Sequence, residues 1–280
     1  MTIDPPPRNL VLTGVPRGGT TLTCHLLNEL PNVVALAEPM DVNAFVPFDD
    51  DTNVHLISAF FAAQRTSLLT EGRALGKSSG GRSVDNPLSD ERDPVTGKRV
   101  HRMSERHVVV HKALAPHFTL AVKHPGAFTA LLPLLAPRFE CFATVRNPLA
   151  VLMSWCDTPF PVASGRAPAA ERLDADLTHR LACEEDLHER QITLLSWFFE
   201  RFRVLAPGHV IRYEEMIATQ GNVLPERMQV PHSLAANLET RNGRSAGAPL
   251  ARRLAHRLVE RAGAYLDHYS PDEILASVEP

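Results

Sequence analysis

The sequence has few of the features that mark membrane-spanning, metal-binding or disulfide-bonded proteins. No stretch approaches the roughly 20 consecutive apolar residues that a helix needs to cross a bilayer. The four cysteines form no C-x-x-C pair and the 13 histidines form no H-E-x-x-H pattern, so we expect neither a disulfide framework nor a metal site. The N-terminus lacks the basic and apolar regions of a signal peptide, which predicts a cytoplasmic protein.

A large excess of charge is absent as well. The 29 Lys and Arg residues against 32 Asp and Glu residues give a formal net charge of −3, which predicts no general attraction to nucleic acid or to an anionic membrane. A chain of 280 residues with 44% hydrophobic content is long enough for one large α/β domain or two small ones. We expect a single domain over residues 1–280, with a flexible insertion around residues 72–106 that is rich in Gly, Ser, Arg and Asp.

The most informative stretch that is present runs from residue 9 to residue 22. The apolar run at 10–12 is typical of a buried parallel strand. Three glycines within residues 14–19 permit a tight turn, and Thr20 and Thr21 can cap the helix that follows. A strand, loop and helix of this kind direct backbone N–H groups and the positive end of a helix at one point. The sequence therefore predicts an anion site, and the usual anion is a phosphate.

This loop is similar to a Walker A loop, but it lacks the lysine. The segment Gly14–Thr21 fits G-x-x-x-x-G-K-[ST] except that Thr20 stands in the lysine position. The cation of the loop is instead Arg17, which favours an anion whose charge is balanced by side chains rather than by a metal ion. A P-loop kinase or NTPase remains an alternative, which Mg²⁺-dependent ATP turnover would reveal.

A second motif follows the predicted strand at 139–145. Arg146 stands at the end of this strand, Pro148 is well placed to open a helix, and Ser154 lies about two turns into that helix. The planar guanidinium can bind a phosphate by two parallel hydrogen bonds, and the serine adds a neutral donor. The motif therefore predicts a second phosphate-binding position.

Together the two motifs resemble those of sulfotransferases that use 3′-phosphoadenosine 5′-phosphosulfate (PAPS). Residues 16–21, Pro-Arg-Gly-Gly-Thr-Thr, resemble the family's 5′-phosphosulfate loop, in which Pro-Lys/Arg-Ser-Gly-Thr-Thr is typical. Arg146 and Ser154 keep the eight-residue spacing of the family's 3′-phosphate motif. The resemblance implies an α/β fold of the P-loop NTPase type, with a mostly parallel sheet between two layers of helices. It assigns the 5′-phosphosulfate to Arg17, Gly18, Gly19, Thr20 and Thr21, and the 3′-phosphate to Arg146 and Ser154.

Two more residues match the tyrosylprotein-type and bacterial branch of that family. Glu38 directly follows a predicted strand at 33–37, and Lys123 ends another at 118–122 within Lys-x-Pro. The resemblance implies that Glu38 is the base for the acceptor hydroxyl, while Arg17 and Lys123 stabilise charge on the bridging oxygen. His124 is the other candidate base, although strand alternation is expected to turn it away from Lys123.

Later segments give weaker matches. Tyr213 follows a predicted strand at 209–212 and resembles the tyrosine of a family segment near the nucleotide, although a packed tyrosine at a helix start has the same pattern. Arg241 and Arg244 lie in a basic glycine-containing loop, and the resemblance implies that they contact the 3′-phosphate. The charged stretch at 184–190 is expected to face solvent.

Five short predicted strands alternate with helices, which is typical of a parallel sheet covered on both faces. By resemblance, the expected reaction moves a sulfonate from PAPS to an acceptor hydroxyl and releases adenosine 3′,5′-bisphosphate, without a metal. Carbohydrate, lipid, phenol and other small-molecule natural-product hydroxyls all fit as acceptors. The segment at 72–106 is expected to be either a lid or acceptor-binding element, or an insertion without chemical role. A non-catalytic nucleotide-binding module remains a further alternative, because Gly18 replaces the usual serine.

Overall fold

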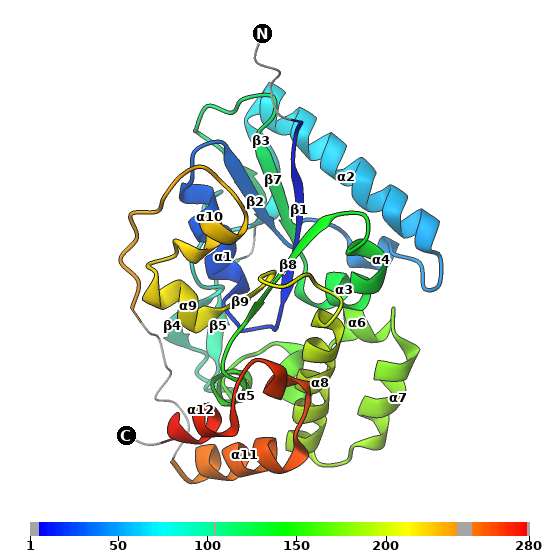
Figure 1. Cartoon of the computed structure of the whole chain (residues 1–280), viewed down its shortest axis with the longest axis vertical. Helices are drawn as coiled ribbons and strands as arrows, with labels where there is room; N and C mark the ends of the chain where they lie inside the picture. Colours follow the sequence, from blue (N-terminus) through cyan, green and yellow to red (C-terminus); the bar gives the residue numbers. More distant parts are fainter. Residues whose placement is uncertain (1–5, 104, 240–247, 279–280) are drawn as a thin grey trace.

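The core of the molecule is a five-stranded sheet, as the sequence predicts. The computed structural model describes residues 6–103, 105–239 and 248–278. The sheet has the order β2-β7-β1-β8-β9, and every pair in it is parallel. Its strands are β1 (Asn9–Gly14), β2 (Val33–Ala37), β7 (Thr119–Lys123), β8 (Glu140–Val145) and β9 (Val210–Arg212). Figure 1 shows this sheet surrounded by helices, which confirms the predicted α/β class.

Each strand is apolar on both faces, because helices cover both sides of the sheet. In β1, Leu10 and Leu12 belong to one buried cluster, while Val11 between them belongs to another. The first cluster includes side chains of α1 (Thr20–Glu29), α9 (Tyr213–Ala218) and α10 (Val223–Arg227). The second cluster includes side chains of α2 (Asp50–Glu71), α3 (Pro125–Ala130), α4 (Leu132–Leu135), α5 (Pro148–Cys156), α8 (Leu187–Phe202) and α11 (Ala248–Arg261). The result is the expected arrangement of three layers.

The segment at 72–106 departs from the sequence expectation of an irregular loop. It contributes two small antiparallel sheets, one pairing β3 (Arg73–Ser78) with β6 (Glu105–Val109) and one pairing β4 (Leu88–Arg92) with β5 (Arg99–His101). Much of β4 and β5 is exposed, so these strands lack the apolar pattern by which strands are recognised. The β3–β6 pair also joins residues about 30 positions apart, which no local turn signal marks.

The remaining helices are α6 (Pro168–Glu171), α7 (Ala175–Cys183) and α12 (Pro271–Ala276), which pack against α3, α8 and α11 respectively. The 3₁₀ turns lie at Val42–Ala44, Pro161–Ser164 and Ala264–Asp267. None of the helices within the described residues is both long and apolar enough to cross a membrane.

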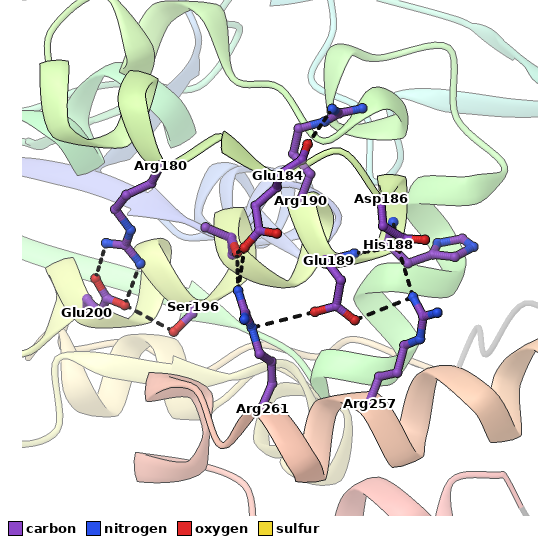
Figure 2. Close-up of polar contacts among 11 residues, drawn as sticks. Arg180, Glu184, Asp186, His188, Glu189, Arg190, Ser196, Glu200, Arg257 and Arg261 are labelled. Atoms are coloured by element: carbon purple, nitrogen blue, oxygen red, sulfur yellow. Dashed lines mark hydrogen bonds and ion pairs between the residues drawn. The ribbon is translucent and has the colours of Figure 1, made fainter. Parts of the chain in front are cut away.

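The charged stretch at 184–190 does not simply face solvent, in contrast to the sequence expectation. Figure 2 shows Arg257 and Arg261 reaching from α11 to acidic side chains at the start of α8. Arg261 pairs with Glu184 at 2.5 Å, and Arg257 pairs with Asp186 at 2.9 Å. The stretch therefore helps to hold α11 against the body of the protein.

Candidate active site

The carboxyl ends of all five central strands meet at one cleft. Arg17 lies in the loop after β1, Glu38 directly follows β2, and Lys123 is the last residue of β7. Arg146 directly follows β8, and Tyr213 directly follows β9. All five side chains line the same cleft, whose volume is about 1380 Å³. Parallel strands place their carboxyl ends at one edge, so residues up to 196 positions apart in the chain reach one ligand-sized space.

The loop after β1 depends on glycine for its close packing. Gly14 has a φ of 143°, and a Cβ built there would lie 2.2 Å from the carbonyl oxygen of Thr144 in β8. Gly18 is buried, and its N–H donates to the carbonyl of Val15 at 2.8 Å, which closes the turn. Gly19 has a φ of 99° and lies so close to Tyr213 that a Cβ would approach its ring to 2.9 Å.

Helix α1 begins at the cleft without a side-chain cap. The N-cap residue is Gly19, so the expectation that Thr20 or Thr21 caps the helix is wrong. Both threonines instead occupy the first turn of the helix, and both line the cleft. The first N–H groups of a helix have no intrahelical acceptor. An uncapped N-terminus at a cleft therefore offers these donors, and the positive end of the helix dipole, to an anion.

Arg17 ties this loop to helix α5. Its Nε donates to Ser154 Oγ at 3.1 Å, and its two terminal nitrogens lie 3.3 Å from Asn86 Oδ1. The neighbouring Trp155 donates its indole N–H to the carbonyl of Pro16 at 2.8 Å. The two sequence motifs are thus in direct contact, because α5 braces the glycine loop from the side.

Arg146 is held at the start of the same helix. Its guanidinium lies over the ring of Tyr213 at 4.3 Å from the centroid, and the residue is 9% exposed. Asn147 caps α5 by accepting from the N–H of Leu149 at 3.0 Å. The N–H of Asn147 donates in turn to Glu214 at 2.9 Å, which joins this corner to α9. Tyr213 is therefore packed at a helix start, and it also lines the cleft beside Arg146, which is expected to bind a phosphate.

Positive charges are concentrated around Arg17. The pKa of Arg17 is lowered to about 10, mainly by burial and also by the nearby guanidinium groups of Arg99 and Arg146, against smaller opposing effects of Asp157 and Tyr213. The arginine stays charged at neutral pH. Like charges in a partly buried cleft repel each other, and an anion bound among them would relieve this repulsion. The arrangement therefore favours an anionic ligand.

A second charged cluster lies around Glu38. Lys123, which is 2% exposed, donates to Oε1 of Glu38 at 2.9 Å, and Lys77 from β3 donates to Oε2 at 2.5 Å. Burial by itself would raise the pKa of the Glu38 carboxyl, but the two ammonium groups hold this pKa well below its usual range. The cleft therefore contains an ionised carboxylate whose two oxygens each face one lysine.

His124 is not placed to act as a base. It is 3% exposed, and its Nε2 accepts a hydrogen bond from the N–H of Met40 at 3.1 Å. The pKa of His124 is lowered to about 3, mainly by burial; Glu38 opposes this shift, and the positive charges of Lys123 and Lys77 add to it. The imidazole is thus neutral and already engaged, and it packs edge-on against Phe128.

Two candidates from the sequence lie outside the described residues, namely Arg241 and Arg244. Three residues of the cleft were missed by the sequence analysis: Lys77, Asn86 and Arg99. All three come from the segment at 72–106, which was interpreted as a loop. The run Gly76-Lys77-Ser78 gave no signal of its own, because Glu38, the partner of Lys77, lies 39 residues away directly after β2. No group of three or more His, Cys, Asp or Glu residues in the described part of the chain is arranged to hold a metal ion.

Comparison with known proteins gives distant similarities only. No family model and no curated protein matches the chain. Among solved structures, it is similar to a sulfotransferase from Alicyclobacillus acidocaldarius, with 13% identity over 99% of this chain and 96% of the other, and a TM-score of 0.44. It is also similar to the sulfotransferase domain of the Synechococcus PCC 7002 olefin synthase, with 15% identity over 99% and 89% of the two chains, and a TM-score of 0.36. Similarity of this degree assigns neither a family nor an activity to the chain.

Proposed function

We propose that the protein is a PAPS-dependent sulfotransferase that acts on a hydroxyl acceptor. The observation that carries this proposal is the presence of two cationic positions in one cleft, at Arg17 and at Arg146, with an ionised glutamate and its lysines in the same space. PAPS carries two anionic groups on one ribose, a phosphate at the 3′ oxygen and a phosphosulfate at the 5′ oxygen. Such a ligand matches a cleft in which the charge of Arg146 is close enough to lower the pKa of Arg17.

The residues of the cleft fit the two anionic ends of this co-substrate. The uncapped start of α1, with Gly19, Thr20 and Thr21, would hold the 5′-phosphosulfate together with Arg17. Gly18 would act through the shape of the turn, since its N–H is already bonded to Val15. These five residues belong to one continuous loop and helix start.

Arg146 and Ser154 would hold the 3′-phosphate, with Tyr213 supporting the Arg146 guanidinium. Ser154 is bonded to Arg17 in the free protein, so nucleotide binding would replace that bond with bonds to the ligand. Arg241 and Arg244 would make further contacts with the 3′-phosphate.

The proposed reaction is a direct displacement at sulfur. The acceptor oxygen forms a bond to sulfur, the bond from sulfur to the bridging oxygen breaks, and its electron pair leaves with adenosine 3′,5′-bisphosphate. Glu38 takes the proton of the acceptor hydroxyl, and Lys123 and Arg17 stabilise the charge that develops on the bridging oxygen. A carboxylate of low pKa is a weak base, which suffices only when proton removal accompanies the attack rather than precedes it.

A labelled-sulfate transfer screen tests this function. The purified protein is incubated with ³⁵S-labelled PAPS and representatives of four acceptor classes: carbohydrates, lipids, phenols and other small alcohols. The proposal expects a labelled product from at least one class, in equal amount with adenosine 3′,5′-bisphosphate and without added Mg²⁺. Binding of the nucleotide with no transfer to any class would indicate a non-catalytic module, and Mg²⁺-dependent ATP hydrolysis would indicate a P-loop NTPase.

A further inference from the structure

The segment at 72–106 brings a lysine to the catalytic carboxylate. Strand β3 packs beside β2, and a Cβ on Gly76 would lie 3.9 Å from the backbone nitrogen of Ala37. Lys77 and Glu38, the residues that follow Gly76 and Ala37, are therefore also close to each other. This contact joins a strand of the small β3–β6 sheet to the end of a strand of the central sheet.

The two lysines approach the carboxylate differently. Lys123 belongs to the central sheet and is 2% exposed, so it lies at the floor of the cleft. The Lys77 side chain is 42% exposed and comes from the rim. Each lysine faces one oxygen of Glu38, at 2.9 Å and 2.5 Å respectively. The cluster therefore has two cations for one anion, and one cation is in excess.

The second lysine beside Glu38 becomes important when the anionic sulfonate donor binds in the cleft. An ammonium group has three donors, and Lys123 must direct at least one of them to the transferring group if it stabilises the bridging oxygen. Lys123 would then balance the negative charge of Glu38 less fully, while this carboxylate is still partly buried. Burial disfavours the charged form of a carboxylate. Lys77, which is bound to the other oxygen of Glu38, still balances that negative charge.

We propose that Lys77 is a positioning residue for the transfer reaction: it fixes the Glu38 carboxylate through Oε2 and leaves Lys123 available for the sulfonate. This inference rests on the proposed function, and it assigns a chemical role to the segment at 72–106. The same contact engages a glutamate that directly follows β2 and whose backbone has a φ of 47°, which few non-glycine residues adopt.

The test measures the titration of Glu38 directly, without reliance on activity. The charged or titratable groups that face this carboxylate are Lys123 from β7, Lys77 from β3, His101 from β5 and His124 after β7, with the Cys24 thiol from α1 nearby. The carboxyl signals of ¹³C-labelled glutamate are followed by NMR from pH 7 down to the lowest pH at which the fold persists, because the pKa of Glu38 lies well below the usual range of a carboxyl. Glu38→Gln identifies the Glu38 signal by its disappearance.

Removal of a cation disfavours the ionised carboxylate, so the pKa of Glu38 must rise when Lys77 is neutralised. We expect Lys77→Met to raise this pKa by about 1 unit or more. Lys77→Arg, which keeps the charge, should restore most of the original value. Lys98→Met removes another lysine of the same segment and should leave the Glu38 signal unchanged. His101→Asn shows whether the imidazole contributes to the shift.

Kinetics on the same variants, with an acceptor found in the transfer screen, show whether the position matters for turnover. We expect kcat to fall about 10-fold or more in Lys77→Met, and the acid limb of the pH profile of kcat to move to higher pH. The Kd for adenosine 3′,5′-bisphosphate should change less than about twofold. Lys77→Gln replaces Lys77→Met if the latter folds poorly.

An unchanged Glu38 titration in both neutral variants would overturn the inference. So would an equal kcat in Lys77→Met and the wild type, or a loss in Lys77→Arg as large as in Lys77→Met. Absence of transfer by the wild-type protein in every acceptor class would instead count against the proposed function, and the NMR result would still decide whether Lys77 holds Glu38.

Discussion

Two of the proposed site residues have backbone angles that side chains normally avoid. Arg17 has a φ of 70° and Glu38 has a φ of 47°. Each such residue costs on the order of 1–3 kcal/mol, and strained backbone of this kind is concentrated at functional sites. Glu38 directly follows β2, and Arg17 lies in the loop after β1. Their conformation is consistent with selection for a side-chain direction rather than for stability.

The first prediction concerns the carboxylate of Glu38. Glu38→Gln keeps the size of the side chain but removes the proton acceptor, so we expect turnover to fall by about 10²-fold or more. The affinity for adenosine 3′,5′-bisphosphate should stay within about threefold, since neither phosphate position includes this residue. Steady-state sulfonate transfer and calorimetry give the two values.

Glu29→Gln is the matched control for this prediction, because Glu29 is an exposed glutamate at the end of α1 that lines the outer part of the cleft. It should leave turnover near the wild-type value. Undiminished turnover in Glu38→Gln would show that another group, or water, accepts the proton.

The cleft residues at the ends of central strands could be predicted from the sequence, whereas those of the segment at 72–106 could not. Glu38 and Arg146 directly follow an apolar strand and Lys123 ends one, so their position at the sheet edge could be predicted from the chain alone. Lys77 lies within a strand of mixed exposure, and its partner Glu38 is 39 residues away. The contact depends on packing of β3 against β2, which no local pattern of the sequence encodes.

At the scale of elements, the glycine loop is fixed by its contact with β8. The register pairs Gly14 with Thr144, and the N–H of Val15 donates to the carbonyl of Thr144 at 3.1 Å. The loop thus leaves β1 along the adjacent strand before it turns into α1. The position of Arg17 relative to Arg146 is therefore set by the β1–β8 pair.

The second prediction follows from this close approach. Gly14→Ala would place a methyl group 2.2 Å from the Thr144 carbonyl, so we expect it to lower the free energy of unfolding by about 3 kcal/mol or more. Gly80→Ala is the control: Gly80 also has a positive φ, of 57°, but no atom lies within 4 Å of the added carbon. That change should cost only about 1 kcal/mol.

Urea denaturation of both variants measures this difference. Equal losses would mean that the contact between β1 and β8 relaxes without cost, and that the glycine is required only for its backbone angle.

The central strands were predicted to within a residue or two, whereas the four strands of the segment at 72–106 were not. A buried parallel strand is recognisable because both of its faces are apolar, as in residues 10–12 and 119–122. In β4 only Leu88 is buried, so the strand is held by its hydrogen bonds and carries no hydrophobic pattern. The irregular composition of this segment was correctly noted, but composition does not distinguish a loop from a small exposed sheet.

At the scale of the whole molecule, the C-terminal helices close the side of the cleft that Arg146 occupies. Asn147 Nδ2 donates to the carbonyl of Glu273 in α12 at 3.1 Å, and α11 packs against α5, which carries Ser154. The arginines of α11 secure this arrangement by their pairs with the start of α8 (Figure 2).

The third prediction concerns these ion pairs. The double variant Arg257→Gln, Arg261→Gln should lose about 1–2 kcal/mol of stability at low salt, because exposed pairs contribute little singly but act here as a network. The loss should fall by about half or more in 1 M NaCl, where charges are screened. Thermal denaturation at the two salt concentrations gives both values.

The control for this variant is the double change Arg252→Gln, Arg253→Gln, which alters two exposed arginines of the same helix. It should have a smaller and less salt-dependent effect. A loss that persists unchanged in high salt would indicate that the arginines act through packing of their aliphatic parts.

The central claim is that one cleft holds both the 3′-phosphate and the 5′-phosphate of one adenosine, and calorimetry tests it most directly. The wild type and Arg146→Ala are each titrated with adenosine 3′,5′-bisphosphate and with adenosine 5′-phosphate, and Arg166→Ala serves as a control from another wall of the cleft. We expect the bisphosphate to bind the wild type at least about 10-fold more tightly, since charge-assisted bonds to the 3′-phosphate contribute roughly 1.5–3 kcal/mol. This preference should disappear in Arg146→Ala and persist in Arg166→Ala. Equal affinity of the wild type for the two nucleotides, or a preference that survives the loss of Arg146, would contradict the account.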